Sequence, residues 1–252
     1  MRSRLAAVLA CRNLGSRLYG KPLQRLDIES GWRVLDQVIA NIRRFDCIDE
    51  IVLAISVGTD NIAFKDYAER NSLPYVFGDE HDVLSRLLLG LDLTNATDLF
   101  RVTTESPFLF WQPVEQAWAD HVVNGFDATF MDDVIDGCGF EIISGSALRK
   151  SWEHGESRHR SELCSLFIRE NRNSFFVSQL FAPPLLCRKD LRLTVDYPED
   201  LVVCRSVYSR FQEMMLRCDY SLFDIVSFLD DNPMLKSLVS PFTEQGYQTM
   251  YL

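Results

Sequence analysis

The feature that most constrains the fold is a regular alternation of two kinds of apolar segment in the first half of the chain. Short runs rich in branched residues, typical of buried strands, are separated by stretches whose apolar residues recur every three or four positions, as in amphipathic helices. The expected strands are 5–11, 50–56, 74–77 and 98–103, and the expected helices are 33–44, 62–70, 82–91 and 113–124. Strand, crossover helix and parallel strand in this order predict a doubly wound α/β fold with a mostly parallel sheet.

The second half is less regular and predicts further elements around the same sheet. Strands are expected in the segments FDATFM, FEIIS, SFFVSQLF and LRLTV, which begin at residues 126, 140, 174 and 191. Helices are expected at 161–171 and 198–211, and two short amphipathic helices at 221–229 and 233–239. We therefore expect one α/β domain over residues 1–212 and a helical C-terminal extension over residues 213–252.

The charge is unevenly distributed along the chain. Asp and Glu total 36 against 26 Lys and Arg, and this net charge of −10 disfavours binding to nucleic acids and to anionic membranes. Residues 1–26 nevertheless contain six basic side chains and no acidic one. This local excess of positive charge needs a local explanation.

Cysteine usage and hydropathy indicate a cytoplasmic protein without a membrane span. The seven cysteines form no CxxC pair and are scattered through apolar stretches, which favours reduced thiols over disulfides. Neither they nor the four histidines have the spacing of a zinc site. The N-terminal apolar run is too short for a signal peptide, and no stretch reaches the roughly 18 residues of a membrane span.

The loop at residues 12–23, directly after the first expected strand, is the strongest candidate for a binding site. It places three cations, a hydroxyl and two glycines close together, and ligands of α/β sheets lie at the carboxyl ends of the strands. Cationic groups on a backbone that can approach closely are what a polyphosphate needs. Pro22 stands where a Walker A loop would need a hydroxyl. On charge alone, a solvated basic loop is an equally good interpretation.

Two acidic residues follow other expected strands. Asp196 ends the strand LRLTV and precedes a helix start at Pro198, so its carboxylate could hold a magnesium ion or cap the helix, and the pattern favours capping. Glu105 lies in a turn after the strand at 98–103. Taken alone, that turn is typical of a protein surface.

The order and spacing of these stretches resemble the cytidylyltransferases that make CMP-activated sugar acids, in the branch of spore-coat-polysaccharide and acylneuraminate cytidylyltransferases. Residues 12–23 match the family loop R-x-x-S-T-R-L-P-G-K-x-L at seven positions, with Tyr19 in place of the proline. Residues 194–201 are close to the family's T-V-D-T-P-E-D-L. Further similar segments are 77–86, 136–144, 162–171 and 223–233. The resemblance covers nearly the whole chain and implies a fold like that of the nucleotide-diphospho-sugar transferases.

The resemblance implies a reaction in which an acceptor oxygen attacks the α-phosphate of CTP, releasing pyrophosphate and forming a CMP-linked product. Lys21, Arg12 and Arg17 match family positions that imply binding of the triphosphate and charge stabilisation during attack. Ser16 is expected to donate a hydrogen bond to phosphate. A homodimer is a further expectation from the family.

The family's metal and acceptor positions are also occupied, with changes. Glu105 and Asp196 are expected to hold Mg²⁺, although Glu105 stands in the sequence TTESP where the family has an aspartate in T-G-D-C-P. Arg86, Glu141 and Glu162 are weaker candidates for the acceptor pocket. These changes leave two alternatives open: transfer to another acceptor such as a sugar phosphate or phosphonate, and a non-catalytic nucleotide-binding homologue.

Overall fold

The computed structural model describes residues 3–13, 15, 17–217 and 219–250, with the backbone alone for residues 245–250. Within them one seven-stranded sheet has the order β3-β2-β1-β4-β6-β5-β7. Its strands are β1 (Leu5–Cys11), β2 (Ile48–Ser56), β3 (Tyr75–Gly78), β4 (Asp98–Arg101), β5 (Ala128–Asp133), β6 (Phe140–Ser144) and β7 (Val177–Phe181). All neighbouring strands are parallel except that β6 is antiparallel to β4 and to β5. The predicted doubly wound, mostly parallel sheet is confirmed.

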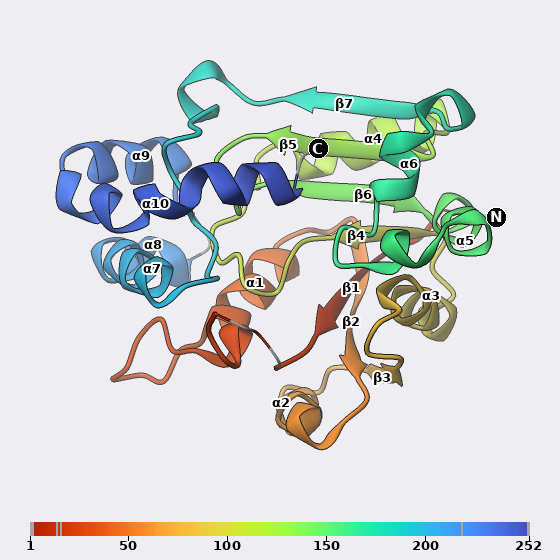
Figure 1. Ribbon diagram of the computed structural model, residues 1–252, viewed down its shortest axis with the longest axis horizontal. Coiled ribbons are helices and arrows are strands. Elements are labelled where there is room, and N and C mark those ends of the chain that lie inside the picture. The colour runs from red at the N-terminus through yellow and green to blue at the C-terminus, as the bar shows by residue number, and fades with distance from the viewer. Residues whose placement is uncertain (1–2, 14, 16, 218, 251–252) are drawn as a thin grey trace.

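Helices cover both faces of the sheet (Figure 1), because successive side chains of a buried strand point to opposite sides. Leu5 and Leu9 of β1 belong to one apolar cluster, and Ala6 and Val8 belong to a second one. The first cluster includes residues of α1 (Val34–Arg43), α2 (Ile62–Arg70), α4 (Val114–Asn124) and α7 (Pro198–Arg210). The second includes residues of α3 (Val83–Thr94), α5 (Gly145–His154) and α6 (Leu166–Glu170).

The structure differs from the prediction in several elements. The segment LRLTV forms no strand and makes only one bridge, between Arg192 and Asp136. Its apolar residues are buried, but the Arg192 side chain between them binds carboxylates instead of packing in a strand ladder. The helix expected at 161–171 is shortened to α6, and α5 was not predicted. Ser144 ends β6 and caps α5 by accepting a hydrogen bond from the Ala147 N–H, so strand and helix follow without a loop.

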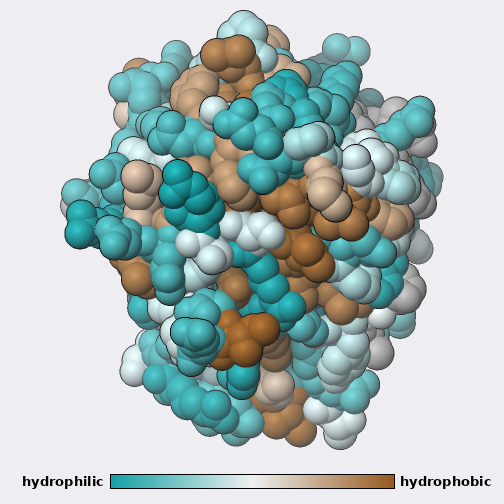
Figure 2. All heavy atoms as spheres, turned by 90° about the vertical axis from the view of Figure 1, so that its left-hand side faces the viewer, coloured by the Kyte–Doolittle hydropathy of each residue, from teal (hydrophilic) through white to brown (hydrophobic). Residues whose placement is uncertain are grey.

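The C-terminal helices pack against the rest of the fold. They are α8 (Gln212–Leu216), α9 (Leu222–Asp230) and α10 (Pro233–Met250), the last of which extends well beyond the predicted end at residue 239. Ile225 and Leu229 of α9 belong to the first apolar cluster. The Tyr220 hydroxyl donates to the Leu109 carbonyl at 2.9 Å. Figure 2 shows this end of the molecule, where apolar side chains form a broken band between hydrophilic ones. The division at residue 212 stays a proposal.

Two further observations concern helix length and the cysteines. In the part of the chain that the structure describes, no helix is long and apolar enough to cross a membrane. Six cysteines are free, namely Cys11, Cys47, Cys138, Cys164, Cys187 and Cys204, while Cys218 lies outside the described residues. None of these six described cysteines forms a disulfide in the structure.

Candidate active site

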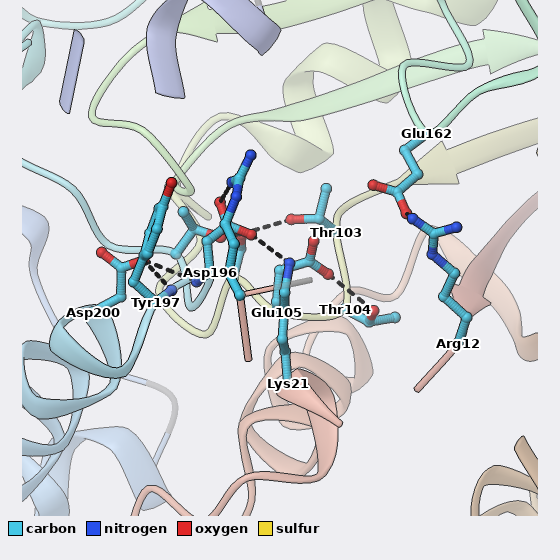
Figure 3. Close-up of polar contacts among 12 residues, drawn as sticks. Arg12, Lys21, Thr103, Thr104, Glu105, Glu162, Asp196, Tyr197 and Asp200 are labelled. Carbon is cyan, nitrogen blue, oxygen red and sulfur yellow. Dashed lines mark hydrogen bonds and ion pairs between the residues drawn. The ribbon is translucent and has the colours of Figure 1, made fainter. Parts of the chain in front are cut away.

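A cavity of about 550 Å³ lies at the carboxyl ends of β1 and β4, where ligands of doubly wound sheets are expected. Four of the segments that line it are the loop after β1, the turn after β4, residues 161–163 and residues 192–196; residues between 80 and 87 and Asp136 also line it. Figure 3 shows side chains from all four of these segments converging on this region. The cavity brings together Arg12, Arg17, Lys21, Arg86, Glu105, Glu162 and Asp196 from the predicted site.

The loop after β1 is held in a folded-back shape by its own backbone. Asn13 is buried, and its N–H donates to the Asn61 side chain at 2.8 Å. The Gly20 N–H donates to the Asn13 carbonyl at 3.0 Å, and Gly20 has a φ of 61°, a conformation that glycine adopts without strain. The short 3-10 helix η1 (Lys21–Leu23) follows at once and directs Lys21 into the cavity. Ser16 lies outside the described residues.

Asp196 forms ion pairs with two cations of the loop after β1. Lys21 Nζ donates to Asp196 Oδ1 at 2.7 Å, and Arg17 Nη1 lies 3.7 Å from Asp196 Oδ2. Burial opposes ionisation of this carboxyl, but Lys21, together with Arg192 and Arg17, holds its pKa below the ordinary value. Asp196 is therefore an ionised group that orients Lys21 and Arg17 toward one place.

Arg192 was missed as a site residue, although it lines the cavity and is only 2% exposed. Its Nη1 lies 2.6 Å from Asp136 Oδ2, its Nε lies 3.0 Å from Asp200 Oδ1, and its Nη2 pairs with Asp196. Burial, despite Arg192, raises the pKa of Asp136 to about 6. One sequence feature could have indicated this role. Arg192 lies inside the apolar run LRLTV, and a buried strand there would bury a charged side chain, which needs a partner.

Asp200, rather than Asp196, satisfies the start of helix α7. Its Oδ2 accepts hydrogen bonds from the Asp196 N–H at 2.8 Å and from the Tyr197 N–H at 2.9 Å. The interpretation of Asp196 as a helix cap is therefore wrong, since its side chain binds cations in the cavity. The predicted preference for acids at this helix start is confirmed at Asp200.

Glu105 follows β4 and faces the same cavity. The Thr104 hydroxyl donates to Glu105 Oε2 at 3.1 Å, and the Val195 N–H donates to the Glu105 carbonyl at 3.0 Å, which joins this turn to the segment before Asp196. Burial raises the pKa of Glu105, and the nearby carboxylates of Glu162 and Asp196 add to the rise. An added cation would relieve this repulsion.

The donor set fits a magnesium ion bound together with a phosphate ligand. No cluster of three or more potential metal ligands occurs among the residues that the structure describes. Magnesium sites that include substrate phosphates need only one or two protein carboxylates, because water and phosphate oxygens complete the shell. Glu105 and Asp196, both of which line the cavity, meet that requirement.

Arg12 and Glu162 form an exposed ion pair at the cavity. Arg12 Nη2 lies 2.6 Å from Glu162 Oε1, and the two side chains are 39% and 61% exposed. Figure 3 shows the two side chains pointing toward one another. Arg101 Nη2 donates to the Glu162 carbonyl at 2.6 Å and so fixes the backbone of this segment. A pair this exposed contributes little stability, so Arg12 can exchange Glu162 for another anion.

Arg86 lies on α3 and is almost fully buried, yet it also lines the cavity. Its Nη1 donates to the carbonyls of Asp79 at 2.6 Å and Glu80 at 3.0 Å. Its Nε has no hydrogen-bond partner among the described residues. Burial lowers the pKa of this guanidinium.

Glu141 lies behind the cavity, where it borders a small space of about 30 Å³ instead. Its carboxylate accepts from Arg101 Nη1 at 3.0 Å, from Arg169 Nη2 at 2.8 Å and from the Ser165 hydroxyl at 2.6 Å. Burial would raise its pKa, but Arg101 and Arg169 hold the pKa of Glu141 below its ordinary value. Glu141 thus positions Arg101, which does line the main cavity.

Two relatives align with nearly the whole chain. An uncharacterized protein of Methanocaldococcus jannaschii is 23% identical over 245 residues, covering 97% of this chain and 98% of the relative. The spore coat polysaccharide biosynthesis protein SpsF of Bacillus subtilis is 23% identical over 231 residues, covering 90% of this chain and 94% of that protein. No protein-family model matches the chain.

Solved structures share the fold. A cytidylyltransferase from Leptospira borgpetersenii superposes with a TM-score of 0.82 at 18% identity, covering 93% of this chain and 97% of that one. A CMP-2-keto-3-deoxy-manno-octonic acid synthetase complexed with CTP gives a TM-score of 0.60 at 14% identity, covering 82% and 99%. A Mycobacterium tuberculosis protein in complex with manganese gives 0.56 at 14% identity, covering 81% and 99%. The resemblance to cytidylyltransferases is thereby confirmed as a fold shared along most of the chain.

Proposed function

We propose that this chain is a cytidylyltransferase that transfers CMP from CTP to a sugar acid and releases pyrophosphate, with Mg²⁺ as cofactor. The observation that carries the proposal is the convergence of Lys21 and Arg17 on Asp196, beside Glu105, at the carboxyl ends of β1 and β4. The relatives and the shared fold support the same reaction type. A homodimer and a cytoplasmic location belong to this proposal as well.

The proposed reaction is a nucleotidyl transfer. The oxygen of an acceptor hydroxyl forms a bond to the α-phosphorus of CTP and gives up its proton to solvent, the bond from that phosphorus to the bridging β-phosphate oxygen breaks, and the electron pair leaves with pyrophosphate. Positioning and charge neutralisation supply most of the catalysis in such transfers. Lys21, Arg17 and Arg12 would exchange their carboxylate partners for phosphate oxygens as the nucleotide binds.

Glu105 and Asp196 would hold the magnesium ion, which neutralises phosphate charge when bound. Once Lys21 and Arg17 had turned to phosphate, Asp196 would keep Arg192 as a partner and would have acceptor positions left for the metal, because its carboxylate has two oxygens. On the acceptor side, Arg86 and Glu162 line the same cavity, and Glu141 acts through Arg101. A sugar acid would offer its carboxylate to the cationic part of that wall.

The proposal is tested by pyrophosphate release from purified protein with Mg²⁺, a panel of nucleoside triphosphates and a panel of sugar acids. Release is expected with CTP and with at least one sugar acid. Lys21→Ala is expected to abolish it, whereas Lys65→Ala, which removes an exposed lysine paired with Glu69 on α2, should leave the rate unchanged.

Absence of release with every nucleotide, together with absence of a CTP-dependent shift in melting temperature, would refute the proposal. CTP binding without turnover on any acceptor would instead identify a non-catalytic nucleotide-binding protein. Release only with sugar phosphates or phosphonates would keep the reaction type and correct the acceptor.

A further inference from the structure

The C-terminal helix α10 reaches the candidate active site through one aromatic contact. Phe242 on α10 stacks on Tyr197, with ring centroids 3.9 Å apart and planes 13° apart. Tyr197 directly follows Asp196 and precedes α7, against which α10 packs. Phe242, in the C-terminal extension, therefore contacts the residue next to Asp196, the carboxylate that binds Lys21 and Arg17.

Tyr197 also contacts a cation of the phosphate-binding loop. The Arg17 guanidinium carbon lies 5.0 Å from the centroid of the Tyr197 ring, within the range of a cation–π contact. Arg17 has a second contact in Asp196, whose Oδ2 lies 3.7 Å from Arg17 Nη1. The aromatic ring is thus the contact that Arg17 can keep when a phosphate replaces Asp196 as its anionic partner.

The Tyr197 backbone is fixed independently of its side chain. Its N–H donates to Asp200, the buried residue that also accepts from the Asp196 N–H. With the backbone fixed, the position of the ring depends on what packs against it, and Phe242 supplies a nearly parallel face. Phe242 of α10 therefore contacts Tyr197, and Tyr197 in turn contacts Arg17.

We propose that Phe242 is a positioning residue for nucleotide binding, which sets the Tyr197 ring and through it the Arg17 guanidinium. The C-terminal extension then forms part of the nucleotide site rather than serving stability alone. This inference rests on the proposed function, since it assigns the bound anion to a nucleoside triphosphate. It predicts that the affinity for CTP depends on an aromatic ring at position 242.

The test is the Kd of CTP measured by titration calorimetry in the presence of Mg²⁺. Phe242→Ala is expected to raise the Kd about three- to tenfold, the range of one lost aromatic contact and a displaced cation. Phe242→Tyr keeps the ring and is expected to stay within about twofold of wild type. Phe228→Ala removes a different aromatic contact of the extension, with Phe211 at a centroid distance of 5.8 Å, and should leave the Kd unchanged.

A double-mutant cycle separates positioning from a general loss of structure. Tyr197→Leu alone should raise the Kd to a similar extent, and adding Phe242→Ala to it should cause almost no further rise, because both act through one ring. Equal CTP affinity of wild type and Phe242→Ala, or fully additive effects, would overturn the inference. Failure of the wild type itself to bind CTP would instead overturn the proposed function.

Discussion

Replacing Arg192 with methionine should strongly destabilise the fold, because the side chain neutralises three carboxylates. Asp136 and Asp200 among them are 2% and 0% exposed, so neither gains water as a replacement partner. Breaking a buried ion pair by removing one partner costs about 3–5 kcal/mol. At about 2–4 °C per kcal/mol for a domain of this size, the melting temperature should fall by about 6–20 °C.

A matched control is available in Arg188, which also pairs with two aspartates but at the surface. Its partners are Asp190 at 2.7 Å and Asp230 at 2.8 Å, both of them exposed. Exposed pairs contribute about 0–1 kcal/mol, so Arg188→Met should melt within a few degrees of wild type. Differential scanning calorimetry of both variants, at equal protein concentration, measures the difference.

The loss should also depend on pH in a definite direction. The pKa of Asp136 in the folded protein is about 6, above its unfolded value of 3.8, so the folded state binds more protons between these values and the unfolding free energy falls as pH rises. Arg192 lowers this pKa. Its removal should raise the pKa further and extend the loss of stability above pH 6. The reasoning is refuted if Arg192→Met melts like Arg188→Met, or if its deficit is the same at pH 5 and pH 8.

Two further substitutions separate function from stability. Glu105→Gln should raise the half-saturating Mg²⁺ concentration for pyrophosphate release about tenfold, since a carboxylate ligand is lost. It should also raise the melting temperature at neutral pH, because a carboxyl with an elevated pKa costs stability when ionised, and a lower melting temperature would contradict this. Glu141→Gln should cost about 3–5 kcal/mol of unfolding free energy, measured by urea titration, because Arg101 and Arg169 lose a buried partner. Exposed Glu156→Gln is the control, and equal midpoints for the two variants would show that Glu141 is not a structural ion-pair partner.

Elements governed by local pattern were predictable from the sequence. β1 and β6 have the predicted bounds because each is a short, mostly apolar run that is buried along most of its length. Asp82 caps α3 by accepting from the Ser85 N–H at 2.9 Å, an interaction that involves only residues three apart. The cluster of cations after β1 was recognisable for the same reason, since one short loop contains all of them.

Features that depend on distant partners were not predictable. LRLTV has the composition of a strand, but its Arg192 side chain pairs with carboxylates both before and after it in the sequence. One of these partners, Asp136, lies 56 residues away. Glu141 was assigned to the acceptor pocket from its motif, yet its position behind the cavity is set by Arg101 and Arg169. The length of α10 and its contact with Tyr197 likewise depend on packing against α7.

The charge inventory of the cavity bears on how a nucleotide must arrive. Six arginine and lysine side chains and five carboxylates line it among the described residues, so the charges of the protein alone are already close to balance. A triphosphate that entered alone would add several negative charges to this balanced set and would compete with the carboxylates for every cation. A triphosphate that enters as its magnesium complex carries most of its own compensation. On the proposed function, we therefore expect the cavity to favour the metal complex over the free nucleotide, and its affinity for CTP to follow the concentration of divalent cation more closely than that of monovalent salt.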